Sequence, residues 1–118
     1  MPPRLFTYGS LMPGRAYAHL LDPAPGEWEV ASVNGFIDQN GWGHSTGFPA
    51  VILSEAGASI PGMLLTSERL PLLWPQLDDY EGDAYQRIRT RVMRSDGSYV
   101  DAFVYTLHAD LQQDTYYR

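Results

Sequence analysis

Two short segments hold the residues whose types and spacing could do chemistry. The first, Tyr8-Gly9-Ser10-Leu11, follows a short apolar run, which predicts a strand that ends in a glycine turn. The backbone amides of such a turn can face a carboxylate or an oxyanion. The second segment, residues 77–82, contains Glu81, a candidate acid–base group. If the two segments meet in space, they form a small active site.

The position of Glu81 predicts a raised pKa for its carboxyl group. The residue lies at the end of a predicted helix, where backbone carbonyls concentrate partial negative charge, and it closely follows Asp78 and Asp79. Partial burial against Tyr80 would act in the same direction. A raised pKa suits a carboxylate that works as a base near neutral pH. A solvated acidic helix end is the alternative that the residues alone leave open.

A serine nucleophile has weak support. Gly9-Ser10 lacks the later glycine of the G-x-S-x-G elbow, and a hydrolase would need Ser10 to meet one of the histidines. In the simpler interpretation Gly9 supplies backbone freedom and Ser10 caps a turn. The histidines at 19, 44 and 108 have no ligand-like spacing and the chain has no cysteine, so no metal site is expected.

The charge pattern argues against large anionic partners. The net charge is −6 and all eight basic residues are arginine, so neither nucleic acid nor a membrane surface is expected as a partner. Four arginines cluster between residues 87 and 94, which fits one small anion better. Most of them are expected on a solvated strand face. Arg87, on the same face as Tyr85, could lie near Glu81 and hold a substrate carboxylate.

The elements that must position these groups are short. Strands are predicted at 5–8, 27–36, 49–54, 60–65, 85–92 and 99–107, and helices at 16–21 and between Ser67 and Gly82. Ser67 is expected to cap the second helix, Pro75 to kink or delay it, and Gly82 to end it as a left-handed cap. The third and fourth strands are joined by a connection of hairpin length, and residues 95–98 join the last two strands.

These elements predict one α+β domain over residues 1–118. A chain of this length with 44% hydrophobic residues can bury a core, and about six short strands with two short helices favour a barrel-like sheet. The glycine-rich residues 40–47 are predicted to form an exposed loop. The start lacks a signal-peptide pattern and no apolar run approaches eighteen residues, so a cytoplasmic protein is expected.

Four segments, in this order, resemble γ-glutamylcyclotransferases. They are Phe-Thr-Tyr-Gly-Ser-Leu at 6–11, Gly-Phe-Pro-Ala-Val at 47–51, Pro-Gly-Met-Leu at 61–64, and Leu-Asp-Asp-Tyr-Glu-Gly at 77–82 followed by Tyr85-Gln86-Arg87. The likeness runs over nearly the whole chain and is closest to the small γ-glutamylamine cyclotransferase branch. The runs at 12–17 and 37–47 differ from the family pattern, which leaves the leaving group open.

The resemblance implies a small mixed β-barrel and a reaction. Residues 8–11 would hold the γ-glutamyl group, with Tyr85 and Arg87 also at the substrate, and Glu81 would be the proton acceptor. The substrate's α-amine would attack its own γ-carbonyl, close 5-oxoproline and expel an amine or amino acid, without a cofactor. Such an intramolecular attack needs positioning and proton transfer rather than a protein nucleophile. The alternative is a module that binds a small carboxylate ligand in the same loop without turnover.

Overall fold

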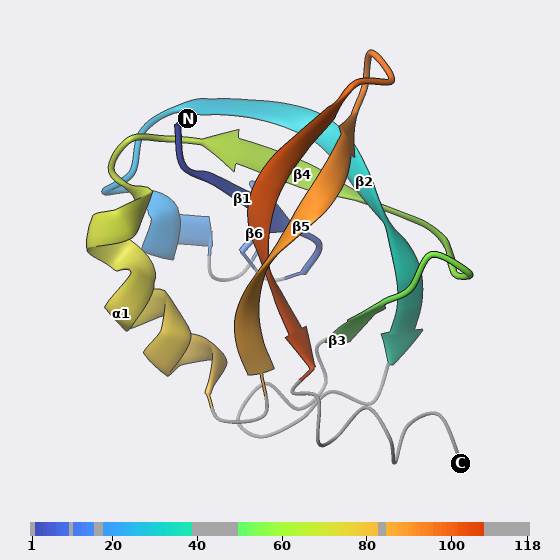
Figure 1. Cartoon of the computed structure of the whole chain (residues 1–118). Helices are drawn as coiled ribbons and strands as arrows, with labels where there is room; N and C mark the ends of the chain where they lie inside the picture. Colours follow the sequence, from blue (N-terminus) through green and yellow to red (C-terminus); the bar gives the residue numbers. More distant parts are fainter. Residues whose placement is uncertain (1, 10, 16–17, 39–49, 83–84, 108–118) are drawn as a thin grey trace.

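A six-stranded mixed sheet forms the body of the protein, and one α-helix packs on its outside (Figure 1). The computed structural model describes residues 2–9, 11–15, 18–38, 50–82 and 85–107. Ser10, the loop 40–47 and the histidines at 44 and 108 lie outside these residues. The elements are β1 (Arg4–Thr7), a 3-10 helix η1 (Ala18–Leu21), β2 (Glu27–Asp38), β3 (Ala50–Leu53), β4 (Ala58–Thr66), α1 (Leu70–Glu81), β5 (Tyr85–Arg94) and β6 (Tyr99–Leu107).

Five of the strands close into a barrel. Antiparallel pairs run β1–β4, β4–β2, β2–β5 and β5–β6, and a parallel pair between β1 and β6, with Leu5 opposite Phe103, completes the ring. The sixth strand, β3, lies antiparallel to β2 and parallel to β6, with Val51 opposite Thr106. The predicted α+β barrel of six strands is therefore confirmed. Of the two predicted helices, the described part of the first is a single 3-10 turn.

The connection between β3 and β4 does not make a hairpin, which corrects the expectation from its length. Both strands pair with β2 instead, β4 along one edge of it and β3 along part of the other. A strand of 12 residues has room for several partners, and β2 separates the two strands that the loop joins. The predicted hairpin of β5 and β6 is confirmed, because their register runs from Tyr85 opposite Leu107 to Met93 opposite Tyr99.

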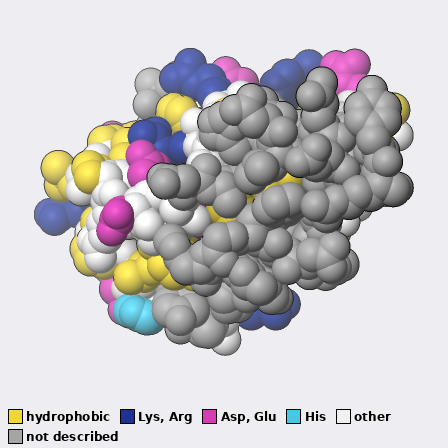
Figure 2. All heavy atoms as spheres, turned by 90° about the horizontal axis from the view of Figure 1, so that it is seen from below, with side chains coloured by type: hydrophobic (Ala, Val, Ile, Leu, Met, Phe, Trp, Pro, Cys, Tyr) yellow, Lys and Arg dark blue, Asp and Glu magenta, His cyan; other side chains and the backbone are white. Residues whose placement is uncertain are grey.

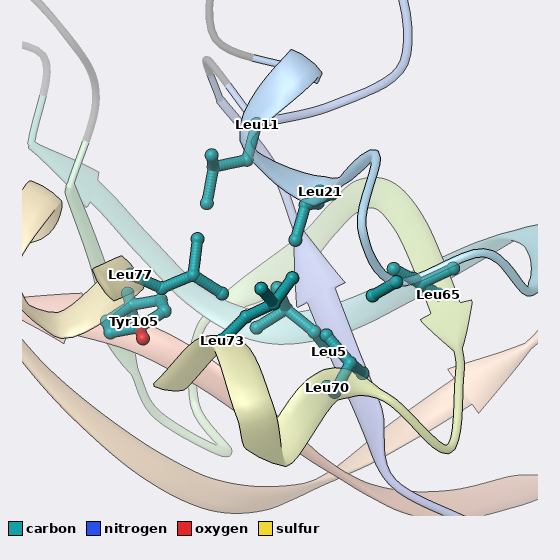
Figure 3. Close-up of a cluster of buried hydrophobic side chains, with 9 residues drawn as sticks. Leu5, Leu11, Leu21, Leu65, Leu70, Leu73, Leu77 and Tyr105 are labelled. Atoms are coloured by element: carbon teal, nitrogen blue, oxygen red, sulfur yellow. The ribbon is translucent and has the colours of Figure 1, made fainter. Parts of the chain in front are cut away.

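Two hydrophobic layers hold the barrel and the helix together. The barrel interior is filled from alternate positions of every barrel strand, by Phe6, Ala31, Val33, Val51, Ile60, Leu64, Val92, Ala102 and Val104. The second layer joins α1 to the outer face of the barrel, and Figure 3 shows its leucines converging beside Tyr105: Leu5, Leu11, Leu21, Leu65, Leu70, Leu73 and Leu77. Helix α1 is therefore fixed along its buried side, and its last residue has a defined place.

Local sequence explains where α1 begins and ends. Pro71 lies in its first turn, where a missing N–H costs nothing, and the helix continues through Pro75 to Glu81. Ser67 does not occupy the N-cap position, which is Arg69, but its hydroxyl accepts a hydrogen bond from the Arg69 amide at 3.2 Å. Gly82 has a positive φ of 84° with an extended ψ of −178°, so it ends the helix without the full left-handed conformation that was predicted.

The Pro-Gly-Met-Leu segment brings β4 close to β1. A side chain at Gly62 would collide with the carbonyl oxygen of Thr7 and the ring of Phe6, so only glycine fits this crossing. The hydroxyl of Thr7 donates to the Met63 carbonyl at 2.9 Å in the same place. Strand β1 is thereby seated against β4 immediately before it leads into Tyr8.

Candidate active site

Glu81 is a partly buried carboxyl group at the end of α1. Burial raises its pKa from 4.5 to about 7. The direction is the predicted one, and of the three predicted causes burial is the one that acts, not the helix end or the neighbouring aspartates. The group can therefore accept and return a proton near neutral pH.

The hydroxyl group of Tyr8 joins three strands at one point. It donates to the carbonyl oxygen of Tyr105 at 2.6 Å and accepts from the amide of Val51 at 3.3 Å. Along the edge of β6, β1 pairs at Phe103 and β3 pairs at Thr106, so the carbonyl of Tyr105 falls between the two partners. Tyr8 fills that interval, and its ring stacks on Phe6 at 6.4 Å between centroids.

Glu81 lies within electrostatic reach of this junction. Burial raises the pKa of Tyr8, and the charge of Glu81 raises it further, as does that of Tyr85, while the Val51 amide acts in the opposite direction. The charge of Glu81 is also felt at the Tyr105 hydroxyl. The structure thus brings together Tyr8, Tyr85 and Glu81, three of the predicted site residues.

Asp78 and Arg87 form an ion pair beside Glu81. The guanidinium of Arg87 donates from Nε to Oδ1 of Asp78 at 2.9 Å and from Nη2 to Oδ2 at 3.3 Å, and it stacks over the ring of Trp74 at 4.5 Å. The hydroxyl of Tyr105 donates to Oδ1 of Asp78 at 2.6 Å. Arg87, which the sequence suggested could lie near Glu81, binds Asp78, one helical turn before Glu81. The network ties the end of α1 to both strands of the hairpin.

The two carboxyl groups titrate in opposite directions. Burial opposes ionisation of Asp78, but the hydrogen bonds from Arg87 and Tyr105 outweigh it and hold its pKa below the usual range. The pKa of Tyr105 is raised, by burial first and then by its hydrogen bond to Asp78. At neutral pH Asp78 is therefore a fixed negative charge, whereas Glu81 exchanges protons.

The other predicted binding residues have structural contacts as well. Gly9 accepts a hydrogen bond from the Met12 amide at 3.0 Å, which closes the turn after β1, and its φ is not positive. The side chain of Leu11 is buried in the layer under α1. Tyr85 packs in a small cluster with Leu107. Ser10 lies outside the described residues.

Asp78 and Tyr105 belong to the site, but the sequence did not predict a site role for either of them. The predicted turn at 95–98 would place Tyr105 opposite Ile88, one residue away from its observed partner Arg87, so the predicted register does not find this contact. The pairing of Arg87 with Asp78 crosses nine positions of sequence, from helix to strand. Only the orientation of α1 on the barrel reveals it.

The end of the molecule that carries this site lies at the bottom of Figure 1 and faces the viewer in Figure 2. Acidic and basic side chains adjoin one another there beside hydrophobic ones. Within the described residues no group of histidine, aspartate and glutamate side chains is arranged to hold a metal ion. The described helices include none with the length and apolar character needed to cross a membrane.

Comparisons with known proteins agree on one family of proteins. The family described as "Gamma-glutamyl cyclotransferase, AIG2-like" matches residues 5–118. No curated protein matches the chain.

Solved structures share the fold. The chain is similar to YkqA from Bacillus subtilis, with a TM-score of 0.70 and 23% identity over 92% of this chain and 36% of that one. It is similar to an AIG2-like protein from Mus musculus, with a TM-score of 0.62 and 26% identity over 89% and 76%. It is also similar to a protein named γ-glutamyl cyclotransferase, with a TM-score of 0.58 and 19% identity over 92% and 68%. The chain thus spans about a third of the Bacillus protein.

Proposed function

Because the chain belongs to the AIG2-like family of γ-glutamyl cyclotransferases, we propose that it cleaves a γ-glutamyl amine or γ-glutamyl amino acid and releases 5-oxoproline. One observation carries the proposal: Glu81, a partly buried carboxyl with a pKa of about 7 at the end of α1, lies within electrostatic reach of the tyrosine of the loop at 8–11. The family resemblance assigns that loop to the γ-glutamyl group. An acid–base group and a binding loop at one place are what the cyclisation requires.

In the proposed reaction Glu81 takes a proton from the substrate's α-ammonium group. The freed amine attacks the γ-carbonyl carbon, and the negative charge that develops on the oxygen is stabilised by backbone amides of residues 9–11. The C–N bond to the leaving amine then breaks as Glu81 returns the proton to that nitrogen. As the lactam forms, the ring nitrogen loses its second proton, which ends on the released amine. The products are therefore 5-oxoproline and the amine as its ammonium ion, with no net change in the enzyme.

The raised pKa makes this proton transfer inexpensive. An α-ammonium group has a pKa of about 7.7–8, so transfer to an exposed glutamate would cost roughly 5 kcal/mol. With a pKa of about 7 for Glu81, the difference falls to about one unit, or roughly 1 kcal/mol. Burial thereby contributes several kcal/mol of basicity without any added charge.

Product analysis tests the activity. The protein is incubated with a panel of γ-glutamyl amines and γ-glutamyl dipeptides, and 5-oxoproline is measured by mass spectrometry. Release from at least one compound is expected, and the pattern across the panel identifies the leaving group. Saturable binding without product from any compound would support the carboxylate-binding module instead.

Glu81→Gln tests the role of the acid–base group. The change keeps the shape and removes the base, so kcat/KM is expected to fall by about 10²–10⁴-fold. In the wild type kcat/KM should rise with pH through about 7, as Glu81 ionises, and the residual activity of the variant should lack that limb. Asp79→Asn is the matched control, because it removes an exposed carboxylate from the same helix end. A Glu81→Gln enzyme with near wild-type turnover would refute the assignment.

A further inference from the structure

A second cavity lies in the barrel wall, away from Glu81, where β2 changes its partner strand. Along one edge of β2, Ala31 and Ser32 pair with the end of β5, and from Gly35 onwards the same edge pairs with β3. Val33 therefore lies at a gap between the two partners, and the Ser54 amide closes one end of this gap by donating to the carbonyl of Asn34 at 3.0 Å. A cavity of about 510 Å³ occupies this gap, lined by β2, the end of β3, β5 and the start of β6.

The lining combines an apolar base with a polar rim. Val33 is buried and belongs to the barrel interior, and Leu53 packs against the same layer. Around them the cavity is lined by the hydroxyl-bearing residues Ser32, Ser54 and Thr90. Binding sites for small molecules commonly have this composition, in which apolar groups supply contact area and a few polar groups fix orientation.

Two opposite charges line the cavity from its two sides. Arg91 comes from β5, and its guanidinium stacks over the ring of Tyr99 at 4.4 Å, which limits its freedom. Glu55 comes from the turn after β3, in which the Ser54 hydroxyl accepts the amide of Ala56 at 3.2 Å. Neither charge forms an ion pair with another residue that the structure describes.

The neighbouring arginines differ from Arg91 in this respect. Arg87 is bound to Asp78, and Arg94 donates to Glu29 at 2.9 Å. Arg89 stacks on Phe103 at 5.5 Å and does not line the cavity. The arginine cluster that the sequence predicted as an anion site is therefore divided by the fold, and Arg91 is the member that faces a cavity.

We propose that this cavity is a second ligand site, which binds a free α-amino acid as its zwitterion. Arg91 binds the carboxylate, Glu55 binds the ammonium group, and the side chain of the ligand packs on Val33 and Leu53. A single ligand with both charges satisfies two groups that do not pair with each other. The proposal does not depend on turnover at Glu81, so the two can fail separately.

Titration of the ¹⁵N-labelled full chain with L-leucine tests the site by NMR. Saturable shifts are expected at the amides of Ser54 and Thr90. Two analogues separate the charges: N-acetyl-L-leucine lacks the ammonium group and L-leucinamide lacks the carboxylate. Each should bind about tenfold more weakly than L-leucine, since each loses one charge-assisted contact.

Four variants connect each charge of the ligand to one residue. Arg91→Met should weaken L-leucine about tenfold and leave L-leucinamide unchanged, and Glu55→Gln should weaken L-leucine and leave N-acetyl-L-leucine unchanged. Arg89→Met and Glu68→Gln are matched controls outside the cavity and should change neither. The analogue series on the wild type keeps the test valid if a variant fails to fold.

Three results would overturn the proposal. The first is the absence of saturable shifts with L-leucine. The second is a set of shifts confined to residues around Tyr8 and Glu81, which would place the amino acid in the candidate active site. The third is an equal effect of Arg89→Met and Arg91→Met, because a general attraction to the arginine face of β5 would then explain the binding.

Discussion

Asp78 and Glu81 lie three residues apart on one helix, yet the fold gives them opposite chemistry. Asp78, whose side chain is 46% exposed, is bound by Arg87 and Tyr105 and stays ionised. Glu81 lies within electrostatic reach of Tyr8, and burial raises its pKa to about 7. The comparison shows that a carboxyl group becomes a neutral-pH base here by being placed out of water without a cation.

The ion pair between Asp78 and Arg87 also contributes to the difference in pKa between Asp78 and Glu81. The guanidinium of Arg87 is held by Asp78 and by the face of Trp74. A cation that moved to Glu81 would lower its pKa and remove its value as a base. Asp78 therefore keeps the charge of Arg87 on the outer side of the hairpin.

The largest predicted effect on stability concerns the pH dependence at Glu81. Its pKa is about 7 in the folded state and 4.5 as the reference for the unfolded chain, so the folded state binds the proton more tightly. This contribution is fully present below about pH 4.5 and is lost as pH rises through about 7, a change of about 3 kcal/mol. Urea denaturation of the wild type and Glu81→Gln across pH 4–8 measures it as the difference between the two curves.

The control for that comparison is Asp79→Asn, which removes an exposed carboxylate from the same helix end. Parallel curves for the wild type and Glu81→Gln would mean that Glu81 titrates as an exposed acid. The contrast with Asp78 would then disappear. A larger loss of stability above pH 6 in the wild type than in Glu81→Gln would support the contrast between Glu81 and Asp78.

A smaller effect on stability is expected from Tyr8→Phe, which changes the surroundings of Glu81 and leaves those of Asp78 unchanged. The Tyr105 carbonyl and the Val51 amide both lose a hydrogen-bond partner, which should cost about 1–3 kcal/mol of stability. Loss of the hydroxyl also makes the surroundings of Glu81 less polar, so the acid limb of kcat/KM should move to higher pH. Tyr99→Phe, at an exposed ring, is the control. An unchanged stability would mean that water replaces the hydroxyl.

The smallest stability effect is expected from Asp78→Asn, which changes only the exposed side. Its ion pair with Arg87 is open to solvent, so the loss should be below about 1 kcal/mol. The released guanidinium is then free to approach Glu81, and the acid limb of kcat/KM should move to lower pH. Glu29→Gln, which releases Arg94 elsewhere on the barrel, is the matched control and should not move the limb. A limb that stays in place in Asp78→Asn would show that Arg87 is held by Trp74 alone.

The strands of this protein can be predicted from the sequence more easily than the pairing between them. Period-two alternation and a four-residue turn were enough to predict β5 and β6 as a hairpin, because both signals are local. The link between β3 and β4 is equally short, but β2 lies between them. Loop length constrains distance and does not choose a strand's neighbour, so this pairing could not be derived locally.

The site shows the same limit in its electrostatics. A raised pKa for Glu81 was predicted from the helix end, the neighbouring aspartates and partial burial. Of these three causes only burial acts, and its extent depends on how α1 lies on the barrel. The cluster of arginines is split by partners 9 and 65 positions away. Glu81 was found because its segment resembles a family motif, and Asp78 and Tyr105 were not assigned because their roles arise from contacts between elements.

The parallel pairing of β1 with β6 has a consequence for how the protein is made. Tyr8 is synthesised early, and the carbonyl to which it donates lies 97 positions later, at Tyr105. During synthesis the ribosome must deliver nearly all of the described chain before the barrel can close, so contacts of this sequence separation predict slow, late folding. Because burial sets the raised pKa of Glu81, we expect this raised pKa to appear only once the barrel has closed.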